Sequence, residues 1–567
     1  MHTTSAPLPD HSFFDRIRGA VLRTTRTRWL APLFLGIWLT GCASLPDQVD
    51  RPISTALANP AETRIGSLVA QRAATAGTRN DSGFALVGSA DLAFTSRMTL
   101  IKAAQKTLDI QYYAIFQDDT TERMFDAMRE AAGRGVRIRI LLDDFNTSGK
   151  NAQVLKLAFE KNFEVRLFNP LPGGRQSLFF RILTNLTDVE GMQRRMHNKM
   201  LVADNAVAIT GGRNLGETYF GQSKDTNFVD IDVLAAGRIA RDLSRSFDQY
   251  WNNPLAYPVQ ALMTEKEIAA IKVSSEPKTG NKPAASPEVS TPVADTSTTA
   301  STVTLPALAD STDLRLLTWT WAPSALLVDK PSKIAADADT TEEAGDTTVD
   351  GLLQLMAQAK NNLLIVSPYF VPGPRMMKEF AALRQSGVKV RVLTNSLASN
   401  DAPAAHVGYS RYRKDLLAMG VEIYEMRAEQ EGSFSSFGSG FGSGSGGANN
   451  GGTGSTGSSR ASLHSKVVVM DERLLVVGSM NLDLRSQLQN SEVAIVIRNH
   501  AISGEAIRLI EPTLLTGAYK VELTDGKLFW KAPAGAAFKD ASDEPDAGAG
   551  LKLLVHLIGP FAPDEML

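Results

Sequence analysis

The chain has 567 residues, of which 43% are hydrophobic and 21% charged, and a formal net charge of -2. This is the balance of a globular protein, and the length suggests about two to four domains. The mild negative charge argues against a surface built mainly to grip nucleic acid, which usually carries a basic excess, but it leaves room for a local basic groove. The single cysteine, Cys42, excludes an intramolecular disulfide.

The N-terminal segment has the pattern of a targeting signal. A region rich in arginine precedes the apolar stretch 29–39, which is too short to span a bilayer. The stretch ends in Leu-Thr-Gly-Cys and resembles a bacterial lipobox. We therefore expect residues 1–41 to be a lipoprotein signal peptide and Cys42 to carry the lipid anchor. An ordinary signal peptide, or an uncleaved anchor with an incidental cysteine, is the alternative.

The expected location follows from this anchor. Two acyl chains are enough to hold a soluble domain stably on a membrane. We expect a lipoprotein of the bacterial cell envelope that faces the periplasm. Because Ala43 rather than an aspartate follows the cysteine, the outer membrane is favoured.

Composition divides the rest of the chain. Residues 42–84 are expected to be a polar, helix-poor lead-in, and residues 85–265 a first folded unit. Residues 266–310 begin as a helix end and become rich in Ser, Thr, Pro and Ala, which predicts a disordered linker. Residues 311–567 form the second unit. Its Gly/Ser-rich insertion 432–461 is predicted to be disordered, as a tolerated loop expansion or as a flap beside an active site.

An internal repeat predicts the architecture. Segments 99–119 and 123–144 of the first half correspond to 351–373 and 375–396 of the second. Each pair contains a helix, a strand, a second helix and a β-branched strand. Helices that alternate with buried strands predict an α/β fold of two α/β/α sandwich units, each with a mostly parallel central sheet. Two copies predict that a pseudo-twofold axis relates the units.

A short motif occurs once in each half with the same internal spacing. It reads His-x-Lys-x4-Asp, and a Gly-x-x-Asn follows at the same distance in both copies. Two such copies in matching halves are not a chance occurrence. The residues are His197, Lys199, Asp204 and Asn214 in the first copy, and His464, Lys466, Asp471 and Asn481 in the second.

The spacing has a physical reason. A histidine and a lysine two positions apart on a strand point to the same face. A glycine turn after the strand brings the asparagine towards the same place. Two such units face to face surround one anionic group, which suits a phosphodiester whose transition state gathers negative charge. The halves differ in this turn, because Gly212 stands where the second half has Ser479, so a supporting role of the serine is not duplicated.

The paired motif resembles that of the phospholipase D superfamily. The resemblance extends over most of the chain, from about residue 85 to residue 500. The stretches 196–220 and 395–425 are most similar to cardiolipin-synthase-C-like members and phospholipase-D-like bacterial lipoproteins. The resemblance implies a two-step displacement, in which one histidine forms a covalent phosphohistidine and the other acts as acid and then base. By analogy His197 is the expected nucleophile and His464 the acid/base, with the reverse assignment open.

The resemblance also implies roles for the other motif residues. The lysines and asparagines are expected to hold the phosphoryl oxygens, and Asp204 and Asp471 to be structural. No metal or other cofactor is implied, because the lysines supply the positive charge. An acidic residue is expected to hold each histidine in one tautomer. The expected partners are Glu492 for His464 and Asp230 for His197, with Asp232 as the alternative to Asp230.

Three features are open between a structural and a functional role. Asp143 and Asp144 end a strand, and a structural role is favoured over a place at a catalytic rim. His406 has the pattern of a packed histidine, but its segment leaves a substrate-side role open. Residues 551–561 are predicted to be a packed final helix, with contact to a membrane surface as the alternative.

The main functional hypothesis is a membrane-phospholipid phosphodiester transferase or hydrolase, by cardiolipin-synthase-type transphosphatidylation or phospholipase D hydrolysis. Phosphatidylglycerol, phosphatidylethanolamine and cardiolipin are candidate substrates or products, and the sequence fixes neither the acceptor nor a protein partner. The chain is expected to be a monomer with an internal pseudo-dimer. A nuclease of the same family is the alternative. The duplicated chain, the expected lipid anchor and the mild negative charge count against it, so no nucleic-acid partner is expected. Two intact motifs disfavour a non-catalytic envelope protein.

Overall fold

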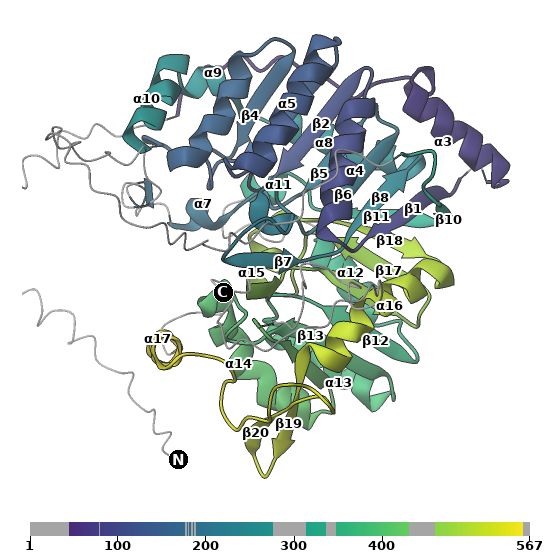
Figure 1. Ribbon diagram of the computed structural model, residues 1–567, viewed down its shortest axis with the longest axis vertical. Coiled ribbons are helices and arrows are strands. Elements are labelled where there is room, and N and C mark those ends of the chain that lie inside the picture. Colours follow the sequence, from purple (N-terminus) through teal and green to yellow (C-terminus); the bar gives the residue numbers. More distant parts are fainter. Residues whose placement is uncertain are drawn as a thin grey trace, which may run out of the picture. The chain divides into compact units, whose positions relative to one another are not determined.

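A computed structural model describes residues 45–78, 80–175, 179, 181–182, 185, 189–275, 313–335, 347–429 and 460–559. The predicted signal peptide, Cys42, residues 276–310 of the predicted linker and residues 432–459 of the Gly/Ser-rich insertion lie outside these ranges. The described residues from Pro46 onward belong to one compact unit. Figure 1 shows that this unit contains two large sheets.

The first sheet is mixed, with a parallel core of β2, β3 and β4. All its other neighbouring strands pair antiparallel. The strand order is β10 (Thr320–Ala322), β1 (Ser82–Val87), β8 (Asp232–Ala236), β6 (Val207–Gly211), β5 (Met200–Ala203), β2 (Thr107–Tyr112), β3 (Arg137–Asp143), β4 (Phe163–Phe168) and β9 (Ala256–Pro258).

The second sheet repeats this pattern, with β12, β13 and β14 as its parallel core. Its other neighbours are antiparallel. The order is β11 (Ser324–Val328), β18 (Val493–Arg498), β17 (Leu474–Gly478), β16 (Val467–Met470), β12 (Asn362–Val366), β13 (Lys389–Asn395), β14 (Glu422–Met426), β19 (Ala518–Thr524) and β20 (Lys527–Lys531).

Helices connect the strands in both halves. The first half contains η1 (Pro60–Glu62), α3 (Arg64–Thr75), α4 (Ala90–Ala103), α5 (Asp119–Gly133), η2 (Gly149–Phe159), α7 (Val189–Gln193), η3 (Glu217–Tyr219), α8 (Arg238–Trp251), α9 (Val259–Leu262) and α10 (Glu265–Ser275). The second contains α11 (Ser332–Ala335), α12 (Thr348–Met356), α13 (Gly373–Gln385), α14 (Pro403–Ala418), α15 (Leu484–Leu488), α16 (His500–Thr516) and α17 (Ala549–Ile558).

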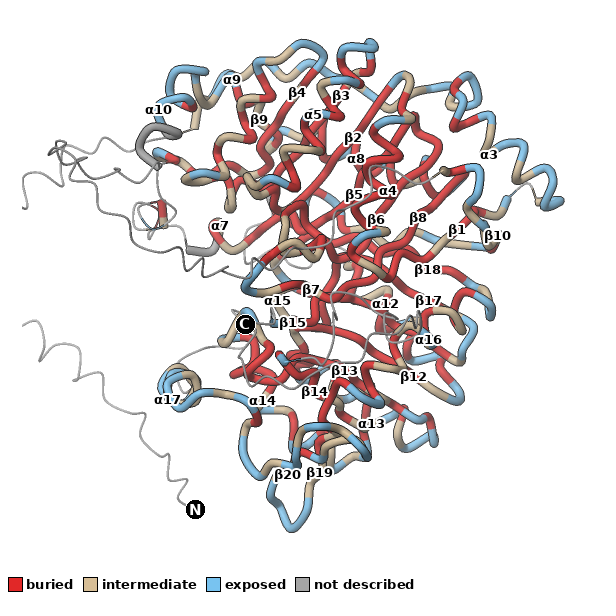
Figure 2. Tube along the Cα trace, in the orientation of Figure 1, coloured by how far each residue is buried: buried red, intermediate tan, exposed pale blue. Residues whose placement is uncertain are grey.

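The core explains the layers. One apolar cluster packs α4 and α5 on the outer face of the first sheet, and another packs α12 and α13 on the outer face of the second. A third cluster joins the inner faces of both sheets with α8 and α16 between them. Figure 2 shows the strands of both sheets as mostly buried. Because this central cluster is shared, each half depends on the other for part of its core.

Local sequence signals account for the matching connections. The Asp118 side chain accepts from the Thr121 amide at the start of α5, and Thr347 caps α12 in the same way. Gly135 and Gly387 follow α5 and α13 with φ of +93° and +86°. This left-handed conformation favours glycine, and it turns the chain into β3 and β13.

The expectation of two related α/β units is confirmed. The predicted parallel pairing is found in the three core strands of each sheet, and the antiparallel flanks make each sheet as a whole mixed. The flanks include the hairpin β5–β6 and its counterpart β16–β17, whose short turns only permit antiparallel pairing.

Three expected boundaries are corrected. The lead-in contains α3, and β1 already belongs to the first sheet, so the first unit begins before residue 85. Helix α10 supplies the helix end expected at the start of 266–310, but it continues to Ser275, so the first ten residues of the range predicted to be a disordered linker are helical. Strand β10 lies after the linker but pairs with β1 in the first sheet. The edge strand β10 and its neighbour β1 are three and six residues long and pair across large sequence separations, so local patterns did not reveal them.

Helix α17 lies on α14 through Val555, which packs near Val371 and Val407. Leu553, Leu554 and Leu557 remain 58%, 45% and 59% exposed, so the predicted final helix exists but is only partly packed. Within the described ranges, no helix combines the length and the apolar character that crossing a bilayer requires.

Candidate active site

The two motif histidines lie where the halves meet. Strand β7 (Thr226–Val229) of the first half pairs in parallel with β15 (Arg460–Leu463) of the second, and Figure 2 labels both strands between the two sheets. The His464 amide donates to the Val229 carbonyl, and the His197 amide donates to the Ser491 carbonyl, both at 2.9 Å. The backbone therefore joins each histidine to the segment of the opposite half that carries an acid.

Each histidine contacts the acid that was expected to be the partner of the other histidine. His197 Nδ1 lies 2.9 Å from both carboxylate oxygens of Glu492. His464 Nδ1 lies 3.0 Å from Asp230 Oδ2. The two acids were found by sequence, but the expected pairing within each half is wrong. Each acid directly follows a residue that is hydrogen-bonded to the histidine of the other half, so the backbone register sets the exchange.

Asp232, the alternative acid, is not a histidine partner. Its Oδ2 accepts from Arg97 at 2.9 Å and lies 3.2 Å from Arg213. All three side chains are buried, so Asp232 neutralises two internal guanidinium groups.

The electrostatics of the site are set by burial. Burial, followed by the charges of Lys199 and Lys466, lowers the pKa of His197 well below its usual value. Burial and the same two lysines also lower the pKa of His464. Both imidazoles are therefore neutral at pH 7 and present an unprotonated ring nitrogen. The charge of each lysine reaches both histidines, in agreement with the crossed contacts that join the two motifs in one site.

The orienting acids respond in the opposite direction. Burial raises the pKa of Glu492 to about 7 and that of Asp230 to about 6, although lysine charges oppose it. Both carboxylates therefore titrate close to neutral pH.

The lysines lie beside their own histidines. Lys199 Nζ donates to the His197 carbonyl at 2.9 Å, and Lys466 Nζ to the His464 carbonyl at 2.5 Å. Burial lowers the pKa of both ammonium groups. An anion between them would offset this cost, because it returns a counter-charge to a desolvated cation.

The asparagines complete the polar lining. Asn214 Nδ2 donates to the Tyr219 hydroxyl at 2.9 Å. The side-chain carbonyl oxygens of Asn214 and Asn481 are buried without a hydrogen-bond partner among the described residues. Buried polar groups are normally satisfied, so these two amides indicate room for a polar ligand.

Ser479 and Gly212 support the acids differently. Ser479 Oγ donates to Glu492 Oε2 at 2.5 Å, and Ser486 Oγ to Oε1 at 2.9 Å. A Cβ atom at Gly212 would lie 2.4 Å from Asp230 Oδ2. In the second half, Ser479 therefore holds Glu492 by a hydrogen bond. In the first half, Asp230 occupies the space that a side chain at position 212 would need.

Asp204 and Asp471 bind backbone rather than the histidines. Asp204 accepts from the amides of residues 105, 106 and 107 at 2.7 to 2.9 Å. Asp471 accepts from those of residues 360, 361 and 362 at 2.7 to 3.2 Å. Both carboxylates thus fasten the motif hairpin to the first core strand of their sheet.

Sequence reasoning missed several contacts of the histidines. The ring of Tyr113 meets His197 edge-on at a centroid distance of 5.1 Å, and Tyr219 meets His464 at 5.3 Å. Phe228 lies 4.9 Å from His464. The sequence offered one signal for these aromatic contacts: Tyr113 directly follows a repeat strand, and Tyr219 lies shortly after the turn of the first motif.

A second pair, of which the sequence named Asp143 with a structural role and missed Asn395, supports the backbone before each histidine. Asp143 Oδ2 accepts from the Met196 amide at 2.8 Å, and Asn395 Oδ1 accepts from the Leu463 amide at 2.9 Å. Asp143 and Asn395 are the last residues of β3 and β13. The repeat itself contained this signal, since both residues end the same strand of their half.

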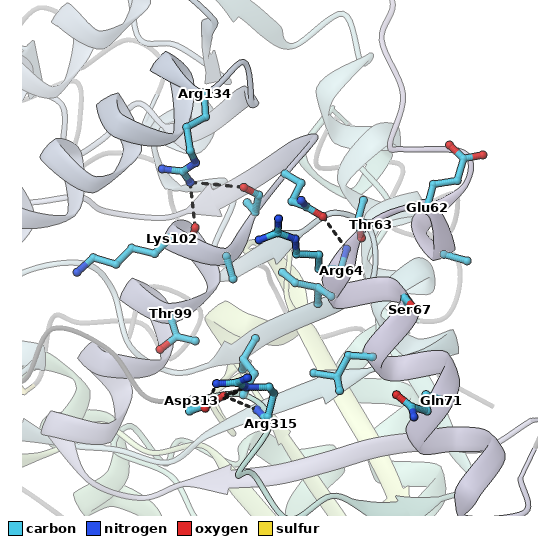
Figure 3. A pocket seen from close by; sticks show the side chains of 17 residues that line it. Glu62, Thr63, Arg64, Ser67, Gln71, Thr99, Lys102, Arg134, Asp313 and Arg315 are labelled. Carbon is cyan, nitrogen blue, oxygen red and sulfur yellow. Dashed lines mark hydrogen bonds and ion pairs between the residues drawn. The ribbon is translucent and has the colours of Figure 1, made fainter.

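The remaining candidates lie away from the motif cluster. Asp144 is bound to Arg175 at 2.9 Å and to Arg181, which is a structural role. His406 is buried and lies 3.4 Å from Glu544, with its ring against Tyr409. A groove of about 1230 Å³ beside α3 and α4 has no motif residue in its lining, and Figure 3 shows Arg64, Lys102 and Arg315 there.

Comparisons with known proteins agree with the duplicated site. A family profile described as "Cardiolipin synthase, PLD-like domain" matches residues 98–251 and 352–512, one match in each half. The chain is 34% identical to "Cardiolipin synthase C" of Escherichia coli (strain K12) over 431 residues, which are 75% of this chain and 83% of that protein. It is 29% identical to an uncharacterized protein of Helicobacter pylori (strain ATCC 700392 / 26695), over 92% of this chain and 97% of that one.

A solved structure shares the fold. The phosphatidylserine synthase of Haemophilus influenzae Rd KW20 aligns with a TM-score of 0.50 and 13% identity, covering 88% of this chain and 99% of that chain. At that identity the likeness shows the fold alone.

Proposed function

Because this chain belongs to the phospholipase D family with cardiolipin-synthase-type PLD-like domains, we propose that it transfers phosphatidyl groups between alcohols through a phosphohistidine intermediate. One observation carries the proposal. Each of two buried histidines has its Nδ1 beside a carboxylate, which leaves Nε2 as the nitrogen for the chemistry, and the charges of both lysines act on both rings. This is an arrangement for two successive displacements at one phosphorus atom.

In the first step, His197 Nε2 attacks the phosphorus of a phospholipid. The P–N bond forms as the P–O bond to the head-group alcohol breaks. Glu492 stabilises the positive charge that develops on the His197 ring, since it lies at Nδ1. His464 gives its proton to the leaving oxygen, and Lys199 and Lys466 stabilise the phosphoryl oxygens. Because His464 is neutral at pH 7, this step requires it to take up a proton from solvent as the anionic phosphodiester binds; the charge of the phosphate and the Asp230 carboxylate at Nδ1 both favour the imidazolium.

In the second step, His464 is the base. It takes the proton of the incoming hydroxyl, whose oxygen attacks phosphorus as the P–N bond to His197 breaks. The lysines supply the positive charge in both steps, so the proposed chemistry runs without a metal ion. A chelator should therefore leave the activity unchanged.

The proposed acceptor is an alcohol rather than water. A relative with 34% identity is named cardiolipin synthase C, so phosphatidylglycerol is the first acceptor to test, with phosphatidylglycerol or phosphatidylethanolamine as donor. Transfer to phosphatidylglycerol gives cardiolipin, whereas transfer to water gives phosphatidic acid.

We also propose that the protein is held on an envelope membrane through a lipid on Cys42, as its lipobox-like sequence suggests. Intact-mass analysis of the membrane-extracted protein tests this. A chain that begins at Cys42 with added acyl mass is the expected result. An unmodified Cys42, or recovery of the Cys42→Ser variant in the same membrane fraction, would contradict the anchor.

The decisive experiment is an assay of purified protein on vesicles of phosphatidylglycerol and phosphatidylethanolamine, with products identified by mass. We expect cardiolipin, and loss of all turnover in His197→Ala and His464→Ala. His500→Ala, in an exposed position at the start of α16, is the matched control. Unchanged vesicles with cleavage of DNA at low salt would instead favour the nuclease alternative.

A quenched reaction locates the intermediate. A histidine-linked phosphatidyl group is labile in acid and adds a defined mass to one peptide. We expect this mass on the peptide of His197. The adduct on the His464 peptide would reverse the two roles, and no adduct with either would argue against covalent catalysis.

A further inference from the structure

Tyr369 lies in a loop that is fastened to the end of the second motif. The loop follows β12, and its Ser367 Oγ accepts from the Leu482 amide at 3.0 Å. The Val371 amide donates to the Leu482 carbonyl at 2.9 Å. Leu482 directly follows Asn481, so this loop is positioned by the residue next to a candidate phosphate ligand.

Asp401 lies in a second loop, which is fastened to the residue before His464. This loop follows β13 and leads into α14. At its beginning, Asn395 donates to the Leu463 carbonyl and accepts from the Leu463 amide, both at 2.9 Å. Near its end, the Ala398 carbonyl accepts from Arg460 of β15. Hydrogen bonds therefore join the second loop to β15, the strand that directly precedes His464.

The two loops meet at one hydrogen-bonded pair. The Tyr369 hydroxyl lies 3.0 and 2.9 Å from the two carboxylate oxygens of Asp401. Asp401 is exposed, and a carboxylate with one donor keeps most of its acceptor capacity. Burial lowers the pKa of His464 and of Lys466, and the charge of Asp401 opposes that effect at both. Asp401 thus acts on the site from the side of His464.

The first half lacks this pair. Ile115 bridges Leu215 as Phe370 bridges Leu482, so Tyr369 corresponds to Ala114. The pair is therefore no part of the duplicated phosphate site. A carboxylate repels phosphate, and what it can bind is a group that donates hydrogen bonds.

We propose that Tyr369 and Asp401 form the subsite for the alcohol head group, and that Asp401 accepts a hydrogen bond from a second donor on that alcohol. The inference rests on the proposed transfer reaction and names its substrate class: small alcohols with a further hydroxyl or ammonium group, such as glycerol or ethanolamine. The leaving and the incoming alcohol occupy the same place, because both exchange a proton with the acid/base histidine.

Competing acceptors test the subsite. The enzyme acts on phosphatidylglycerol vesicles with deuterated glycerol, ethanolamine and 1-propanol, and the ratio of the products is read by mass. 1-Propanol has the size of ethanolamine but no second donor. We expect Asp401→Asn to lower the preference for glycerol or ethanolamine over 1-propanol by about tenfold or more, as for the loss of one hydrogen bond to a charged group. Asp415→Asn, on the exposed side of α14, should keep the wild-type ratio.

Tyr369→Phe is the second variant, and it should lower the same ratio less, since Asp401 stays. If the variants lose preference for glycerol only, the group that Asp401 binds is a hydroxyl. If they lose preference for ethanolamine only, that group is the ammonium. An unchanged ratio in Asp401→Asn, with normal consumption of the donor, overturns the subsite alone. If the wild-type enzyme consumes no donor, the proposed function fails and the subsite fails with it.

Discussion

Glu492 lies behind His197, with both carboxylate oxygens 2.9 Å from Nδ1, although the two residues are 295 positions apart and belong to opposite halves. Asp230 and His464 repeat the relationship in the other direction at 3.0 Å. The acid of each half therefore controls the histidine of the other.

Exchanging one acid for its amide should disturb one histidine only. Glu492→Gln removes the carboxylate that fixes the tautomer of His197, so we expect activity to fall by roughly 10²- to 10⁴-fold. Nitrogen-15 NMR of labelled imidazoles should show altered His197 signals in this variant and altered His464 signals in Asp230→Asn. Altered His464 signals in Glu492→Gln, or altered His197 signals in Asp230→Asn, would contradict the crossed pairing.

Glu492 should also make stability depend on pH. Its pKa rises from 4.5 to about 7 on folding, so between these values the folded chain holds a proton that the unfolded chain has lost. The contribution is fully present below about pH 4.5 and is lost as the pH rises through 7. Relative to Glu492→Gln, the wild type should lose up to about 3 kcal/mol of unfolding free energy between pH 4.5 and 8.

Denaturant titrations at pH 5 and pH 8 measure this difference. Glu130→Gln, an exposed change in α5, is the control and should follow the wild type at both values. Parallel curves for the wild type and Glu492→Gln would show that Glu492 titrates alike in the folded and unfolded chains.

Gly212→Ser should reduce stability and activity more than Ser479→Gly. Gly212→Ser places atoms against Asp230 and the His464 carbonyl, and we expect it to lower the unfolding free energy by about 1–3 kcal/mol and to displace the acid from His464. Ser479→Gly creates no clash; it removes the hydrogen bond to Glu492, which Ser486 still holds, and the one that Ser479 Oγ accepts from the Val493 amide. Stability and initial rates of both variants test this order, and a fully active Gly212→Ser would contradict it.

The motif aspartates should matter to stability more than to chemistry. Asp204 is fully buried and accepts three backbone hydrogen bonds, so Asp204→Ala should lower the unfolding free energy by about 3 kcal/mol or more. Asp471 is partly exposed, and water can replace it, so Asp471→Ala should cost less. Turnover per folded molecule is the second measurement, and its loss in Asp204→Asn would assign this residue a chemical role instead.

The sequence predicted the parts of the site that repeat. The histidines, lysines and asparagines follow from spacing alone, because a strand fixes which side chains share a face. The partners of the histidines did not follow, because the pairing of β7 with β15 joins segments more than 200 residues apart. Strand β10 and helix α3 were missed for a related reason: the three residues of β10 have no pattern of their own, and α3 lies in a stretch judged by its polarity.

The exchange of acids between the halves has a consequence for inheritance. A gene that encoded one half alone would specify a histidine without its acid and an acid without its histidine. Two inactive full-length chains, one altered at His197 and one at His464, should not restore activity when mixed, as subunits of a dimer with shared sites can. Joining the halves in one polypeptide fixes their ratio at one to one, and it allows the halves to differ, as they do at Tyr369 and Asp401, a pair that the first half lacks.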